Sequence, residues 1–223
     1  MIENVLLPRI AENKDWATVL FVLSFAIIAI IKTTFENRFA DFANLIFSNK
    51  YNKVYRDSNH LRSGFTVALF IVQVISFAFF IQIVLSYFGY ATKTDWILYI
   101  QIVTFITFFI LAKLLIEKII ATSFKIEEFL EQFSLQKVTY RTYIGLSILP
   151  LNIILFYYDP FSINIPIAII AIVLTCNVLT YLISIKNYQK IIFGKLFYFI
   201  LYLCALEIAP YYFMYYWFTQ GSA

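Results

Sequence analysis

Residues 65–88 read FTVALFIVQVISFAFFIQIVLSYF, a run of 24 residues without a single charged side chain. A helix that crosses the hydrocarbon core of a bilayer, about 30 Å thick, needs about 20 such residues. The run therefore predicts a transmembrane helix. Further apolar runs occupy residues 16–31, 96–112, 143–158, 165–185 and 191–218. The sequence thus predicts an all-α, polytopic membrane protein with six transmembrane helices.

The composition fits a chain that lies almost entirely in a membrane. Hydrophobic residues make up 62% of the 223 residues and charged residues only 13%, a balance that soluble domains do not show. Six helices with their flanking residues use nearly the whole chain, so we expect a single transmembrane domain over residues 1–220. The last residues, Gly221-Ser222-Ala223, resemble a linker added by cloning.

Basic residues are concentrated in every second connection between the runs. Of the 17 Lys and Arg side chains, 14 lie in residues 32–62, 113–141 and 186–195. Short cytoplasmic loops of membrane proteins carry an excess of Lys and Arg, so these connections are predicted to be cytoplasmic and both termini periplasmic. The net charge of +4 calls for no nucleic-acid partner, because these residues would meet anionic lipid of the bilayer.

Two cytoplasmic stretches show the pattern of amphipathic helices. In the first, Phe35, Phe39, Phe42 and Ile46 form an apolar face, with Glu36, Arg38, Asp41 and Asn44 on the other faces. We expect it to lie in the headgroup plane or to pack beneath the bundle. The second, residues 124–133, is acidic where the first is basic, and the two are expected to attract each other weakly. Ser63 is a predicted N-cap of the second span.

The polar stretch after the first amphipathic segment has two interpretations. It is basic and rich in tyrosine, and it includes Asn49, Lys50, Tyr51, Tyr55 and Arg56. One interpretation is a positively charged loop that faces lipid. The other is a docking surface for a membrane or cytoplasmic protein partner, because Tyr and Arg are favoured at the centres of protein interfaces.

Glu207 is the one acidic side chain well inside an apolar run. Counted from Lys195 at 1.5 Å per residue, it lies about 18 Å from the inner boundary of the membrane. An ionised carboxylate at that depth is costly unless it is paired, protonated or hydrated. Pro210 follows three residues later, and because proline has no N–H it frees a backbone carbonyl beside the acid.

Polar side chains of other runs fall near the same depth as Glu207. The candidates for a functional polar layer are Glu207, Pro210, Asn152, Asn177 and Gln73, with Ser76, Thr104 and Thr107 at similar levels and Pro150 beside Asn152. The layer can be structural, with a protonated Glu that hydrogen-bonds Asn or Gln and fixes helix register. It can also serve proton- or ion-coupled transport, or contact a partner's membrane helix.

The sequence contains none of the motifs HExxH, GxSxG, Walker loop or CxxC, and no pair of neighbouring carboxylates within the membrane. His60 is the only histidine. Cys176 and Cys204 both lie in apolar runs, where we expect buried small hydrophobes rather than a disulfide. We therefore predict a protein that is not an enzyme, with no catalytic residue, no metal site and no cofactor.

Three stretches carry a resemblance to a known family: Phe47-Ser48-Asn49-Lys50-Tyr51, Gln82 with its flanking aromatics, and residues 197–218 with their core Glu207-Ile208-Ala209-Pro210-Tyr211-Tyr212. They resemble a family of unknown function, made up of small inner-membrane proteins of Bacteroidota-type Gram-negative bacteria. The resemblance implies an inner-membrane location. It also suggests, by association, a subunit of a membrane complex linked to type 9 protein secretion or gliding. A small proton- or ion-coupled transporter that uses Glu207 is the alternative.

Overall fold

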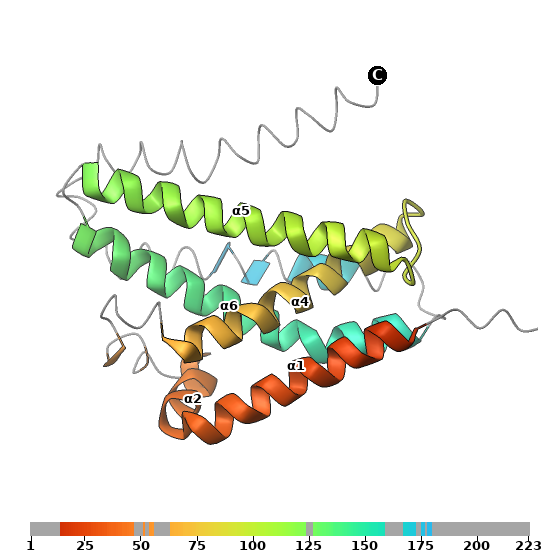
Figure 1. The fold of residues 1–223 in the computed structure, drawn as a ribbon, viewed down its shortest axis with the longest axis horizontal. Coiled ribbons are helices and arrows are strands. Elements are labelled where there is room, and N and C mark those ends of the chain that lie inside the picture. Colours follow the sequence, from red (N-terminus) through yellow and green to blue (C-terminus); the bar gives the residue numbers. More distant parts are fainter. Residues whose placement is uncertain are drawn as a thin grey trace, which may run out of the picture.

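The computed structural model describes residues 14–46, 51, 54–55, 63–123, 127–158, 167–172, 175–176 and 178–179. The elements named in Figure 1 are α1 (Asp15–Thr34), α2 (Glu36–Ala43), the 3-10 helix η1 (Asn44–Ile46), α4 (Gly64–Tyr87), α5 (Trp96–Ser123) and α6 (Glu127–Tyr157). None of the described residues lies in a β-strand. The prediction of an all-α chain is confirmed for this part of the protein.

Four helices are long and apolar enough to cross a membrane. They are α1, α4, α5 and the part of α6 from Ser134 to Tyr157, and they correspond to the first four predicted runs. Residues 165–185 and 191–218 lie largely or wholly outside the described residues. The fifth and sixth crossings therefore stay predictions.

α6 begins much earlier than predicted. The sequence suggested an amphipathic segment at 124–133 and a span from 143, whereas one continuous helix runs from Glu127 to Tyr157. Its membrane-length part already begins at Ser134. The bundle accepts this polar stretch because Lys137 pairs with Glu117 of α5 at 3.4 Å and Thr139 is buried. Groups that are costly to bury alone are tolerated once they are paired.

The four long helices run antiparallel to their neighbours in sequence (Figure 1). The end of α1 with α2, the start of α4, the end of α5 and the start of α6 lie at one end of the bundle. The described parts of the basic connections 32–62 and 113–141 therefore share that end. Aromatic residues mark the other end: Trp16, Tyr90, Trp96, Tyr157 and Tyr158.

α4 is the central helix and packs on α1, α5 and α6, most extensively on α6. At the aromatic end its Phe79 is fully buried. The Phe79 ring lies 4.2 Å from that of Phe21 in α1, 4.5 Å from Tyr99 in α5 and 5.8 Å from Phe156 in α6, measured between centroids. Aromatic pairs at these separations stabilise beyond the area they bury, so one side chain joins four helices.

Hydrogen bonds close the turn between α4 and α5. Gln82 Nε2 donates to the carbonyl of Asp95 at 2.7 Å and to that of Thr92 at 3.3 Å. The Asp95 carboxylate in turn accepts from the backbone N–H groups of Ile97 and Leu98, the N-cap arrangement that satisfies the first turn of a helix. Lys93 Nζ donates to the carbonyl of Leu155 near the end of α6. The turn is thus anchored to three helices.

Candidate functional site

A buried arginine joins α2 to the start of α4. Arg38 is 9% exposed, whereas the amphipathic pattern placed it on a polar face away from the core. Its Nη1 donates to Ser63 Oγ at 2.8 Å and its Nη2 to Thr66 Oγ1 at 3.2 Å. Nε and Nη2 donate to the Tyr51 hydroxyl at 3.4 and 3.3 Å. The prediction for Arg38 was wrong because these hydroxyls satisfy the guanidinium inside the protein.

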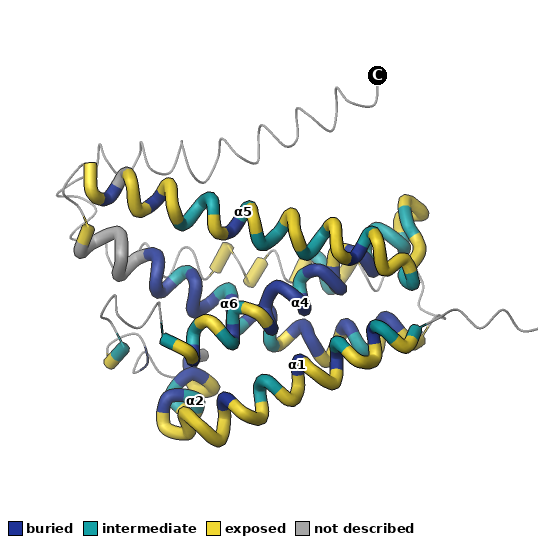
Figure 2. Tube along the Cα trace, viewed as in Figure 1, coloured by how far each residue is buried: buried dark blue, intermediate teal, exposed yellow. Residues whose placement is uncertain are grey.

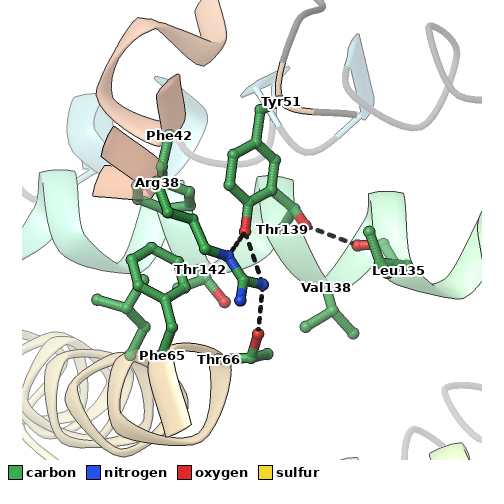
Figure 3. Close-up of a pocket in the computed structure, with 10 residues that line it drawn as sticks. Arg38, Phe42, Tyr51, Phe65, Thr66, Leu135, Val138, Thr139 and Thr142 are labelled. Carbon is green, nitrogen blue, oxygen red and sulfur yellow. Dashed lines mark hydrogen bonds between the residues drawn. The ribbon is translucent and has the colours of Figure 1, made fainter. Parts of the chain in front are cut away.

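Aromatic rings complete the surroundings of this guanidinium. Its central carbon lies 4.5 Å from the ring centroid of Phe65, 5.0 Å from that of Tyr55 and 5.9 Å from that of Tyr51. A cation over an aromatic face is attracted by the ring quadrupole, by about 2 kcal/mol where water is excluded. We call the set Arg38, Tyr51, Ser63 and Thr66 the Arg38 clasp. Figure 3 shows Arg38, Tyr51 and Thr66 of this set.

Tyr51 is part of the core rather than of the surface. It is 3% exposed and packs with Phe42, Leu45 and Phe65. Burial raises the pKa of the Tyr51 phenol, and the charge and hydrogen bonds of Arg38 oppose that rise only in part. The phenol therefore stays protonated at physiological pH. A partner would find little of Tyr51 to contact, although Tyr55 beside it is only half-buried.

Ser63 is the N-cap of α4, as predicted. Its hydroxyl accepts from the backbone N–H of Thr66 at 3.4 Å and also from Arg38. One hydroxyl therefore both starts the helix and fixes the arginine.

A small cavity lies directly beneath the clasp. It measures about 20 Å³, and its lining includes Arg38 and the hydroxyl residues Thr66, Thr139 and Thr142 among apolar side chains. Figure 3 shows Thr66 and Thr142 approaching it from different helices, α4 and α6. A cavity of this size has room for about one water molecule, and its polar lining can hold one.

A fully buried set of polar side chains follows deeper along the α4–α6 interface. Thr142 Oγ1 donates to Gln73 Oε1 at 2.7 Å. Ser76 Oγ donates to the carbonyl of Gly145 at 2.6 Å, and Asn152 Nδ2 donates to the carbonyl of Ser76 at 2.7 Å. Gln73, Ser76 and Asn152 are each 0% exposed. From here on, we use the name polar layer for Gln73, Ser76, Thr142 and Asn152. Of the layer predicted from the sequence, this set contains Gln73, Ser76 and Asn152.

Gly145 explains how the two helices come close enough for these bonds. A Cβ added at Gly145 would lie 2.9 Å from Gln73 Cγ and 3.4 Å from Gln73 Cα. Small residues let membrane helices approach closely, so that polar groups can hydrogen-bond across them.

Two polar atoms of the layer take no part in these hydrogen bonds. Gln73 Nε2 and Asn152 Oδ1 are buried without a hydrogen-bond partner in the described part of the chain.

A third polar contact lies between α5 and α6, nearer the end that holds the basic connections. Glu117 is 5% exposed, and its carboxylate accepts from Ser134 Oγ at 2.6 Å and pairs with Lys137. Lys137 lies on the next helix, so counting along α5 alone could not identify it as a partner of Glu117.

The structure brings together some of the predicted site residues. Gln73 and Asn152 both belong to the polar layer and are linked through Ser76 and Gly145. Tyr51 and Tyr55 both lie against Arg38. The other candidates lie outside the described residues: Glu207, Pro210, Asn177, Asn49, Lys50 and Arg56.

Sequence reasoning missed Arg38, Thr66, Thr142 and Gly145. The spacing of Thr142 and Gly145, one turn apart in an apolar helix, is the signal that could have revealed a close helix contact. Cys176, expected to be buried, is exposed. In the part of the chain that the structure describes, no group of three His, Cys, Asp or Glu side chains is arranged to hold a metal ion.

A protein-family model described as "Domain of unknown function (DUF4271)" matches residues 17–218 of the chain. No curated protein and no solved structure matches it.

Proposed function

We propose that this chain, which belongs to the DUF4271 family of unknown function, is a non-enzymatic integral subunit of a larger complex in the bacterial inner membrane. Its immediate surroundings are the lipid bilayer and a membrane or cytoplasmic protein partner. The proposal includes a topology with both termini in the periplasm.

The observation that carries the proposal is how the polar layer between α4 and α6 is used. In the described part, Gln73, Ser76, Thr142 and Asn152 form hydrogen bonds that join α4 to α6. None of these side chains ionises at physiological pH, so they cannot serve as acid, base or proton carrier by titration. The cavity beside them, about 20 Å³, is far below the several hundred Å³ of a small-molecule pocket. This chemistry holds helices in register.

The arrangement of the helix ends supports the proposed topology. The described parts of two basic connections, 32–62 and 113–141, share one end of the bundle, and Trp16, Tyr90, Trp96, Tyr157 and Tyr158 lie at the other. Lys and Arg favour the cytoplasmic side, whereas Trp and Tyr favour either interface. The link to type 9 secretion or gliding rests on the resemblance of three sequence stretches to Bacteroidota inner-membrane proteins, and on no feature of the fold.

The test is purification of the tagged chain from its own membranes in mild detergent, with quantitative mass spectrometry. We expect one stoichiometric membrane or cytoplasmic protein to co-purify, and a tag on that protein to recover this chain in return. A monodisperse single chain that carries a bound small molecule would contradict the proposal.

The alternative is a small proton- or ion-coupled transporter, favoured by the carboxyl of Glu207 at mid-membrane depth in the sequence. Reconstitution in liposomes with an imposed pH gradient separates the two. For a structural subunit, wild type and Glu207→Gln leave the gradient equally intact, and Glu207→Gln still assembles. Gradient loss with wild type that disappears with Glu207→Gln would establish the transporter instead.

A further inference from the structure

The outward face of α5 is largely exposed. Only 11% of its membrane-length window is buried, against 56% for α4. Its buried residues Tyr99, Ile110, Glu117 and Ala121 face the bundle. Exposed residues recur at alternating spacings of four and three along the opposite side. Figure 2 shows the exposed colour repeating along α5. We call these residues the α5 outer face: Ile97, Gln101, Thr104, Phe108, Leu111 and Leu115.

Two members of this face are polar. Gln101 and Thr104 lie five and eight residues after Trp96, so at 1.5 Å per residue they are about 7.5 and 12 Å inside the aromatic boundary. Both are exposed and form no side-chain hydrogen bond within the described part of the chain. An amide or hydroxyl without a partner in hydrocarbon is costly. Two such side chains favour contact with protein over contact with lipid tails.

The fifth apolar run has packing contacts of its own with α4 and α6. Its described residues Ile169 and Ile170 pack against Phe80 of α4 and against Ile144 and Ile148 of α6. The sixth run, residues 191–218, is 28 residues long and contains Glu207, which needs hydrogen-bond partners at its own depth. α6 ends at the aromatic end, so a fifth span would return the chain and a sixth would run antiparallel to α5.

We propose that the α5 outer face is the docking surface for residues 191–218 of the same chain, with Thr104 as a hydrogen-bond partner of the Glu207 carboxyl. The depths of these two residues agree. Glu207 lies ten residues before Trp217, about 15 Å inside the boundary, against about 12 Å for Thr104. The side chains that would meet the face repeat with the same alternation of four and three: Ile200, Cys204, Glu207, Tyr211 and Met214.

A native cysteine makes the proposal testable. Cys204 lies on the Glu207 side of the run and, 13 residues before Trp217, at about the depth of Phe108, 12 residues after Trp96. In a Cys176→Ala background, Phe108→Cys should give an intramolecular disulfide with Cys204 after mild oxidation in membranes. A disulfide requires Cβ atoms about 3.5–4.5 Å apart. Mass spectrometry of non-reduced digests identifies the linked peptides.

Matched variants separate the outcomes. Ile106→Cys, on the half-buried inner side of α5, should not cross-link, and Cys204→Ser should abolish the Phe108→Cys product. A second pair, Leu111→Cys with Ile200→Cys, tests the same face one turn further and serves if Phe108→Cys fails to fold. Disulfide-linked dimers would mean that a second copy covers the face, and bonding to another protein that a partner does. Either result, or no cross-link in both pairs, overturns the proposal.

Discussion

Gly145 of α6 lies so close to Gln73 of α4 that a methyl group added at Gly145 would come within 2.9 Å of Gln73 Cγ. Gln73 is held in place by the hydroxyl of Thr142, and Ser76 bonds the carbonyl of Gly145 itself. This close approach allows the hydrogen bonds of the polar layer to form. A substitution that prevents the approach is therefore a direct test of how α4 packs on α6.

We predict that Gly145→Ala destabilises the protein by about 1–3 kcal/mol, the cost of overpacking a close contact. Gly64→Ala is the control, because a Cβ there would meet nothing within 4 Å. Thermal unfolding in nanodiscs measures both. Equal stability of Gly145→Ala and wild type would mean that α4 and α6 are not in this contact.

Arg38→Lys should loosen α2 from the bundle. A lysine ammonium cannot reproduce the planar fork that bonds Tyr51, Ser63 and Thr66 together. We expect a loss of about 2 kcal/mol, the typical worth of hydrogen bonds to a charged group, and faster hydrogen exchange in residues 36–46. Lys32→Ala, at an exposed position, is the matched control. Unchanged exchange in Arg38→Lys would show that the clasp does not hold α2.

Tyr51 should make stability depend on pH at the alkaline end. Burial raises the pKa of its phenol above the ordinary 10.0, so the folded state keeps a proton that the unfolded state loses. The contribution is complete below pH 10 and is lost as the pH rises through the folded-state value.

Tyr51→Phe should remove this alkaline loss and weaken the clasp at neutral pH. Unfolding followed between pH 9 and 12 measures the first effect. Tyr90→Phe, at a residue 81% exposed, should behave like wild type. The same alkaline profile in Tyr51→Phe and wild type would assign the titration to another group.

Single cysteines can establish which side of the membrane each end faces. In a background without Cys176 and Cys204, we expect a cysteine at exposed Tyr90 to react with an impermeant reagent added outside the inner membrane. A cysteine at exposed Asn37 in α2 should react only after the membrane is opened. Labelling of the Asn37→Cys variant from outside would reverse the proposed topology.

Sequence alone identified the elements whose signal is local. Length without charge predicted the first four spans, because crossing a bilayer imposes a minimum apolar length on each segment. Ser63 was recognisable as a cap because an N-cap acts on its own helix within three residues. Gln73 and Asn152 could be placed at one depth because each residue adds a fixed rise.

Only the tertiary structure decided which of those residues touch. Arg38 looked like a solvated side chain of an amphipathic helix, and its burial depends on Ser63 and Thr66, 25 and 28 positions away. Glu117 pairs with Lys137 on another helix, in a part of α6 that precedes its predicted apolar run. Periodicity reports which face of a helix is apolar, but it does not report what a polar side chain meets on the neighbouring helix. Whether a buried charge or hydroxyl is tolerated depends on those partners, so the clasp and the polar layer became visible only once the helices were packed.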